Sequence, residues 1–156
     1  MKNKKIDIRS TTILGVRLKG KVAVAGDGQV TLGDMAMKQK AVKVRKFESS
    51  KGGVVGGFAG AAADALTLFE KFEQKLDEYE GDLKRSVVEM AKDWRMDKML
   101  RHLDALLLVM DKKNSFIIAG DGNVIEPDGP VLSIGSGGGF AQAAALAFHQ
   151  SGKYSA

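Results

Sequence analysis

Thr11 and Thr12 are the residues of this chain best suited to chemistry, because of the residue types that follow them. A threonine becomes a strong peptidase nucleophile when it is the first residue of a chain, since its hydroxyl attacks and its own α-amino group takes the proton. The unperturbed pKa of that amine, roughly 7.7–8.0, is close to ideal for a general base at neutral pH. Ten residues precede Thr11, so this interpretation requires residues 1–10 to be removed as a propeptide.

The rest of such a site has candidates further along the chain. A buried lysine beside the amine would keep it neutral by like-charge repulsion. Lys43 is the candidate for this lysine, and Asp27 is the candidate for a carboxylate that holds it in place. The glycine-rich segment 56–60 would let a substrate carbonyl approach the backbone closely, beside an N–H that stabilises the oxyanion. A hydroxyl near the amine, for which Ser136 is the candidate, would complete a proton relay.

Each of these signals also has an ordinary structural explanation. Paired threonines at the start of a strand are typical of β-propensity, and Asp-Gly between apolar runs is typical of a hairpin turn. The basic run 38–46, which contains Lys43, is typical of a solvated surface. Glycine-rich stretches after strands usually mark tight turns. It is the order and spacing of all these residues together that favour the peptidase interpretation.

Six stretches follow one another in order and cover nearly all of residues 11–148: TTILGVR (11–17), AGDGQVTLG (25–33), KAVKVRKF (40–47), GGFAGAAADALTLFEKFEQKL (56–76), EMAKDWRMDKMLRHLDALLLV (89–109) and IGSGGGFAQAAA (134–145). Together they resemble the HslV (ClpQ) family of bacterial proteasome-like threonine peptidases. The resemblance implies that Thr11 is the nucleophile and that Lys43 and Asp27 tune and orient it. It also implies that Gly57 offers the oxyanion N–H and that Ser136 assists proton transfer.

The same resemblance implies partners. Family members assemble into a double hexameric ring, a dodecamer, and work with an HslU-type AAA+ unfoldase that uses the ATP. This chain contains no GxxxxGK[S/T] phosphate loop, so ATP dependence must come from that partner. We therefore expect unfolded proteins as substrates and no cofactor held by this chain.

The chain departs from the family in three places. Its leader of ten residues is longer than usual, and the hairpin at 49–53 is slightly extended. After the position of Ala156, family members continue with another helix and a strand, including a Gly-x-x-Cys-x-x-Thr type segment whose carbonyls bind a monovalent or divalent cation. The resemblance therefore places that cation site outside these 156 residues, and we expect no metal site within them.

Length and composition limit the domain organisation and the kinds of partner that this chain can have. A length of 156 residues with 44% hydrophobic residues predicts one globular domain. The resemblance implies that this is a peptidase domain over 11–156, after the leader. The formal charge of +5 suggests a nucleic-acid partner, but four basic residues and only one acidic residue lie in the leader. No aromatic residues alternate with the remaining lysines as a stacking platform would require. There is also no apolar run long enough to span a bilayer, so we expect neither a nucleic-acid nor a membrane partner.

The absence of cysteine, the composition of the leader and the surroundings of the two histidines argue against further kinds of protein and site. The absence of cysteine excludes a disulfide framework and a thiol nucleophile, and fits a reducing compartment. Because residues 1–10 lack the apolar stretch of a secretory signal, we expect a cytoplasmic protein. His102 and His149 have no ligand-like neighbours, so neither is expected to bind metal. The segment AGDGQV (25–30) recurs as AGDGNV (119–124), and we interpret Asp121 there as part of a strand–turn junction.

Short apolar runs predict the strands, and apolar residues that recur every three or four positions predict the helices. We expect a hairpin over 12–18 and 21–25, a strand over 53–59, helices over 61–79 and 83–103, a hairpin over 105–110 and 115–119, a strand over 131–134 and a helix over 141–149. This order predicts an α+β domain. The resemblance sharpens it to the four-layer αββα sandwich of the N-terminal nucleophile hydrolases, in which Thr11 opens a central strand and faces the cleft between the sheets.

Three functional hypotheses follow. The leading one is the proteolytic subunit of an ATP-dependent protease with an N-terminal threonine nucleophile. The second is a catalytically inactive or truncated structural subunit of the same fold. The third is a basic nucleic-acid-binding module, which would show salt-dependent retention on DNA.

Overall fold

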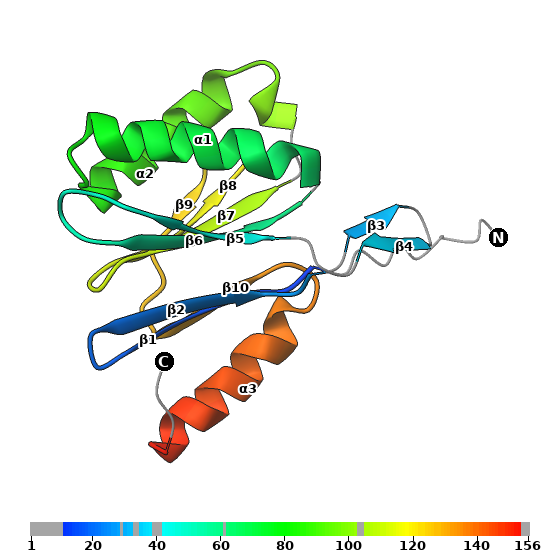
Figure 1. Cartoon of the computed structure of the whole chain (residues 1–156), viewed down its shortest axis with the longest axis vertical. Helices are drawn as coiled ribbons and strands as arrows, with labels where there is room; N and C mark the ends of the chain where they lie inside the picture. Colours follow the sequence, from blue (N-terminus) through cyan, green and yellow to red (C-terminus); the bar gives the residue numbers. More distant parts are fainter. Residues whose placement is uncertain are drawn as a thin grey trace.

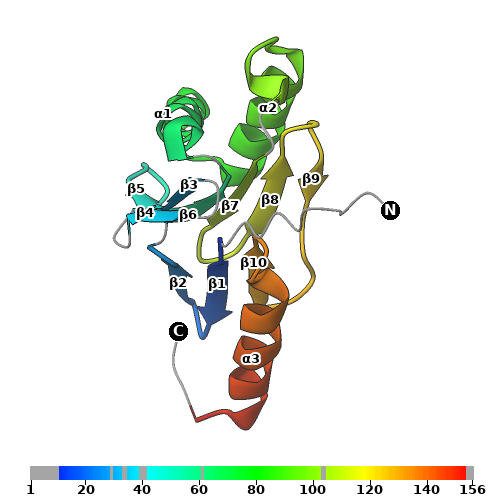
Figure 2. The ribbon, with the colours of Figure 1, turned by 90° about the vertical axis from the view of Figure 1, so that its right-hand side faces the viewer.

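Two β-sheets lie face to face between two layers of helices in the computed structural model (Figures 1 and 2). The structure describes residues 11–28, 30–32, 35–38, 42–60, 62–102 and 105–153, so the predicted propeptide 1–10 lies outside the described residues. The αββα layering confirms the predicted α+β sandwich of the N-terminal nucleophile hydrolase type.

The smaller of the two stacked sheets carries the start of the chain. It contains β1 (Ile13–Leu18), β2 (Lys21–Gly26) and β10 (Val131–Ile134) in the order β10-β1-β2. All its pairs are antiparallel, and Ile13 lies opposite both Gly26 and Ile134. Because of this register, the start of β1 and the ends of β2 and β10 lie side by side at the same end of the sheet.

The larger sheet has five antiparallel strands in the order β5-β6-β7-β8-β9. These are β5 (Val44–Phe47), β6 (Val54–Ala59), β7 (Leu106–Met110), β8 (Ser115–Ala119) and β9 (Val124–Ile125). Two further short strands, β3 (Val30–Leu32) and β4 (Met35–Lys38), pair with each other between β2 and β5 in the chain.

In the described part of the chain, helices cover the outer faces of both sheets. The helices α1 (Ala62–Glu78) and α2 (Leu83–Met96) lie over the five-stranded sheet, and α3 (Gly138–Ser151) lies beyond the three-stranded sheet (Figures 1 and 2). The predicted apolar face of the second helix is confirmed, since its members are all buried: Leu83, Val87, Met90, Ala91 and Trp94.

The described residues form two apolar cores, and β7, which is buried on both faces, contributes side chains to each. Leu107 and Val109 pack toward α1 and α2, whereas Leu108 and Met110 pack into the layer between the sheets. This alternation explains the uninterrupted apolar sequence of the strand. The inter-sheet layer also contains Ile13, so packing between the sheets anchors the residue that follows Thr12.

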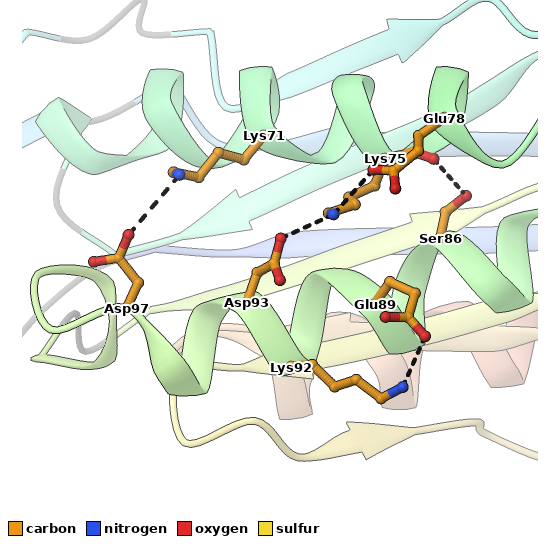
Figure 3. Close-up of polar contacts among 8 residues, drawn as sticks. All are labelled: Lys71, Lys75, Glu78, Ser86, Glu89, Lys92, Asp93 and Asp97. Carbon is orange, nitrogen blue, oxygen red and sulfur yellow. Dashed lines mark hydrogen bonds and ion pairs between the residues drawn. The ribbon is translucent and has the colours of Figure 1, made fainter.

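Charged side chains join α1 to α2 along their outer surface (Figure 3). Lys75 Nζ lies 2.9 Å from a carboxylate oxygen of Asp93, and Lys71 Nζ lies 3.9 Å from one of Asp97. Ser86 adds a hydrogen bond from its hydroxyl to the carbonyl oxygen of Lys75. Hydrogen bonds to Asp93 and Glu78 raise the pKa of Lys75 above its ordinary value. These contacts keep the two helices aligned over the sheet, although exposed ion pairs each add little stability.

The prediction that the second helix continues to Leu103 is wrong. The helix ends at Met96, and a 3₁₀ turn follows at Leu100–His102. Asp97 causes the break, because its carboxylate accepts hydrogen bonds from the backbone N–H groups of Met99 and Leu100 at 2.8 and 3.1 Å. Such side-chain bonds compete with helical ones. The indole N–H of Trp94 then donates to the Leu100 carbonyl at 2.9 Å, which fixes the turn against the core.

Candidate active site

The predicted site residues Thr11, Asp27, Lys43 and Ser136 lie next to strand termini, at the same end of the two stacked sheets. Thr11 precedes β1, Asp27 follows β2, and Ser136 follows β10, so the antiparallel register of the small sheet brings the three together. Lys43 precedes β5 of the other sheet, and its carbonyl oxygen accepts a hydrogen bond from the Phe58 N–H at 3.0 Å. The site therefore spans both sheets.

Lys43 is the central residue of this group. Its side-chain nitrogen lies 2.6 Å from Asp27 Oδ1 and 3.3 Å from Thr11 Oγ1, and it donates to both. The residue is only 9% exposed, so the ordinary interpretation of the basic run as solvated surface does not hold at this position. A buried ammonium needs a paired carboxylate, and Asp27 supplies it. The expected arrangement of lysine, aspartate and threonine hydroxyl is therefore present.

Ser136 lies on the other side of Thr11. The backbone nitrogen of Thr11 donates to Ser136 Oγ at 3.2 Å. In the chain as it stands this nitrogen belongs to an amide, and it occupies the place of the α-amine that removal of residues 1–10 would release. The serine hydroxyl is thus within hydrogen-bond distance of the atom that would act as general base.

Thr12 is held by Asp27 in a way that the sequence interpretation missed. The Thr12 N–H donates to Asp27 Oδ2, and the Asp27 N–H donates to the Thr12 carbonyl at 3.0 Å. One carboxylate therefore binds the ammonium of Lys43 with one oxygen and the backbone beside the nucleophile with the other. The adjacent Thr-Thr pair was the only signal in the sequence that pointed to this second threonine.

Two glycines beside Ser136 lie against the same threonines. A Cβ built on Gly135 would overlap the carbonyl oxygen of Thr11, and one built on Gly137 would overlap Thr12 Oγ1. The N–H of Gly137 also donates to the Thr11 carbonyl at 3.3 Å. The glycines flanking Ser136 were visible in the sequence as a glycine-rich turn, but the partner against which they pack was not.

Gly57 lies inside β6 and not at an open edge. It pairs with Val44 of β5 on one side and Leu108 of β7 on the other. Since the Phe58 N–H points to Lys43, and successive N–H groups alternate sides in a strand, the Gly57 N–H points toward β7. Its role as oxyanion donor stays a prediction, and this direction counts against it. The structure instead shows a packing role, because a Cβ on Gly57 would overlap the Ile13 side chain.

Gly60, at the end of the same glycine-rich segment, has a different orientation. By the alternation that applies to Phe58, the N–H of Gly60 points to the side of the strand on which Lys43 lies. Its φ of +152° belongs to the region that favours glycine. Segment 56–60 therefore still offers a backbone N–H on the side of the site.

The residues set aside in the sequence analysis lie apart from this group. The carboxylate of Asp121 accepts the Asn123 N–H at 3.0 Å, which is a local turn of the kind expected for the second AGDG segment. Within the described residues there is no group of three or more His, Cys, Asp or Glu side chains arranged to hold a metal ion. In the same part of the chain, no helix has the length and apolar character needed to cross a bilayer.

A threonine hydroxyl beside a lysine–aspartate pair, on a sandwich of two sheets, is an arrangement suited to acyl transfer. The sequence model of the proteasome subunit family matches residues 8–151. The ATP-dependent protease subunit HslV of Treponema denticola is 57% identical over 149 residues, which cover 96% of this chain and 83% of that protein. The protein of the same name from Aquifex aeolicus is 55% identical over 97% of this chain and 85% of its own length.

This chain belongs to the HslV family of proteasome-like peptidases. A crystal structure of eukaryotic HslV from Trypanosoma brucei superposes with a TM-score of 0.84 at 46% identity, and covers 93% of this chain and 83% of that chain. Family and fold therefore agree with the interpretation reached from the order of the motifs. HslV-family membership makes the chain a peptidase subunit that acts with an ATPase.

Proposed function

We propose that Thr11 is the nucleophile with which this proteolytic subunit of an ATP-dependent protease hydrolyses peptide bonds. The observation that carries the proposal is the position of Lys43 Nζ, which lies within hydrogen-bond distance of both Thr11 Oγ1 and Asp27 Oδ1. A free hydroxyl is a weak nucleophile at neutral pH and needs an adjacent base. The α-amine of Thr11 would be that base once residues 1–10 are cleaved off between Ser10 and Thr11.

The reaction then proceeds in two stages. The amine takes the Oγ1 proton as the oxygen attacks the substrate carbonyl carbon, and the ammonium of Lys43 stabilises the negative charge that develops on Oγ1. Collapse of the tetrahedral intermediate breaks the C–N bond, and the amine returns the proton to the leaving nitrogen. A water molecule, deprotonated by the same amine, then hydrolyses the Thr11 ester. Ser136 Oγ, which lies 3.2 Å from the Thr11 nitrogen, would pass protons to and from it.

The oxyanion of the intermediate needs a backbone donor. Gly57 is the donor that the family resemblance predicts, and Gly60 is the one that strand geometry favours, because its N–H points to the side of Lys43. Both belong to the glycine-rich segment 56–60. In either case a substrate strand would lie alongside the end of β6.

The assembly that we propose follows the family. The chain would form a double hexameric ring, and an HslU-type AAA+ unfoldase would use ATP to deliver unfolded proteins to it in the cytoplasm. The relatives named ATP-dependent protease subunits support an ATPase partner. In this proposal the chain itself binds no cofactor, and nucleotide is bound only by the partner. Its substrates are polypeptides, with no role for nucleic acid or a membrane.

The test compares the intact protein with two variants of Thr11. Mass spectrometry of active protein should find a chain that begins at Thr11, and a fluorogenic peptide should be hydrolysed in the presence of the partner ATPase and ATP. Thr11→Ala should abolish hydrolysis while light scattering still detects rings, and Thr11→Ser should keep part of the activity because it retains a hydroxyl and an amine. Hydrolysis by Thr11→Ala, or by protein still starting at Met1, would refute the proposal.

A further inference from the structure

Thr12 is fixed from several directions although its own side chain is not part of the proposed reaction. Its N–H and its carbonyl oxygen are both hydrogen-bonded to Asp27, through the carboxylate and the backbone N–H respectively. Its Oγ1 lies against the α-carbon of Gly137 so closely that a Cβ there would overlap it. The next residue, Ile13, is fully buried between the sheets. Thr12 therefore connects a rigid strand to the nucleophile.

Gly137 is required at its position by space and not by backbone conformation. Its φ of −90° and ψ of 0° are accessible to other residues. The obstacle to a side chain is Thr12, whose Oγ1, Cβ and Cγ2 are the three heavy atoms nearest to an added Cβ. Of these, Cβ and Cγ2 would lie at 3.3 and 3.6 Å, which is tight to ordinary contact. Removing Oγ1 alone would therefore make room for an alanine.

We propose that Thr12 is a positioning residue for the reaction at Thr11, clamped between Asp27 and Gly137. Thr11 lies before the paired residues of β1, and its carbonyl is held by the Gly137 N–H at 3.3 Å. The direction of its Oγ1 and amine is set by the backbone of Thr12. Asp27 thus acts twice, on the ammonium of Lys43 and on the backbone that carries the nucleophile. This inference rests on the proposed function of Thr11.

The clamp makes a specific prediction about paired substitutions. Gly137→Ala should lower kcat on the order of a hundredfold, because a displacement of about 1 Å at a reacting group has an effect of that size, and should change KM little. Gly139→Ala is the matched control, since it lies two residues away and an added Cβ meets nothing within 4 Å. It should behave as the unmodified protein. Adding Thr12→Ala to Gly137→Ala should restore kcat to the level of Thr12→Ala alone.

The assay measures kcat and KM for a fluorogenic peptide, using the full chain assembled with its ATPase and ATP. If Gly137→Ala does not fold, the double variant can still be compared with Thr12→Ala, because neither has the clash between residue 137 and Thr12 Oγ1. That comparison alone then tests the clamp. A double variant as slow as Gly137→Ala, or slower than Thr12→Ala by a similar factor, would overturn the clamp. So would an equal loss in Gly139→Ala.

The reference variant Thr11→Ala separates the two ideas. Residual peptide hydrolysis by Thr11→Ala would refute the proposed role of Thr11 as nucleophile. An inactive Thr11→Ala together with no suppression by Thr12→Ala would reject only the clamp. Suppression by Thr12→Ala is a readout that damage at Gly137 unrelated to its contact with Thr12 would not produce, since removing a second side-chain group would then add to that damage.

Discussion

Replacing Asp27 by asparagine changes two hydrogen bonds at the active site with almost no change in shape. In the native side chain, Oδ1 accepts from Lys43 Nζ at 2.6 Å and Oδ2 accepts from the Thr12 N–H. An amide has one acceptor oxygen and one NH₂ group. Whichever way the asparagine side chain is turned, its NH₂ must face either the ammonium or the backbone donor. At least one of the two bonds is therefore lost.

The size of the effect follows from the charge and burial of the pair. A hydrogen bond to a charged group contributes about 1.5–3 kcal/mol, and each 1.36 kcal/mol corresponds to about tenfold in rate. The side chain of Lys43 is 10% exposed, but that of Asp27 is 30% exposed, so water reaches part of the pair. We therefore expect kcat of Asp27→Asn to fall on the order of ten- to a hundredfold. KM should change less, because the substrate does not contact Asp27 in this mechanism.

Asp121→Asn is the matched control. The same substitution there falls in a nearly identical segment, AGDGNV, on an exposed turn whose carboxylate accepts hydrogen bonds within the turn. Asparagine is well suited to such turns. Steady-state peptide hydrolysis by both variants, with circular dichroism to confirm folding, completes the experiment. Equal rates for Asp27→Asn and Asp121→Asn would show that the Lys43–Asp27 pair does not support catalysis.

Three further changes test other contacts. Lys43→Ala should nearly abolish peptide hydrolysis, and Lys43→Arg should restore little because a planar guanidinium does not replace a compact ammonium; normal turnover in either variant would contradict the assigned role. Gly135→Ala should lose peptidase activity, because at φ +92° its Cβ would displace the Thr11 carbonyl, whereas Gly152→Ala, at φ +67° with nothing within 4 Å, carries only the backbone strain and should stay active. Finally, backbone hydrogen bonds from Leu100 and Met99 lower the pKa of Asp97 below its ordinary value, so its contribution to stability is present at neutral pH and is lost as the pH falls through that lowered pKa. Urea unfolding should therefore show Asp97→Asn less stable than the unmodified protein at neutral pH, with the difference shrinking in acid; a difference that grows in acid would refute the sign.

Local patterns in the sequence determined most of the elements. The helix at 62–78 follows from apolar periodicity, and the strands at 106–110 and 115–119 follow from short apolar runs; both signals depend only on neighbouring residues. The end of the second helix was mispredicted because one aspartate side chain, Asp97, outcompeted a periodic pattern that continued past it. Such competition between side chain and backbone is not visible in the spacing of apolar residues.

The residue types of the site were also readable from the sequence. Acyl transfer needs a hydroxyl, a charge pair and a proton relay, and the sequence offers Thr11, Asp27, Lys43 and Ser136 for these roles. The structure brings all four together. The prediction of Gly57 as oxyanion donor rests on the family resemblance alone. Its position between β5 and β7 became clear only from the register of the strands.

Only the tertiary structure decided how these residues act on one another. Lys43 belongs to a basic run of a kind that is solvated in most proteins, and it is buried here because β5 meets the end of β2 across the two sheets. The contact of Thr12 with Gly137 likewise joins residues far apart in the chain, at the point where β1 and β10 pair. Sequence spacing specifies which groups are available, whereas strand register and the stacking of the sheets set their distances. For a nucleophile whose hydroxyl must lie within hydrogen-bond distance of a buried ammonium, those distances determine the chemistry.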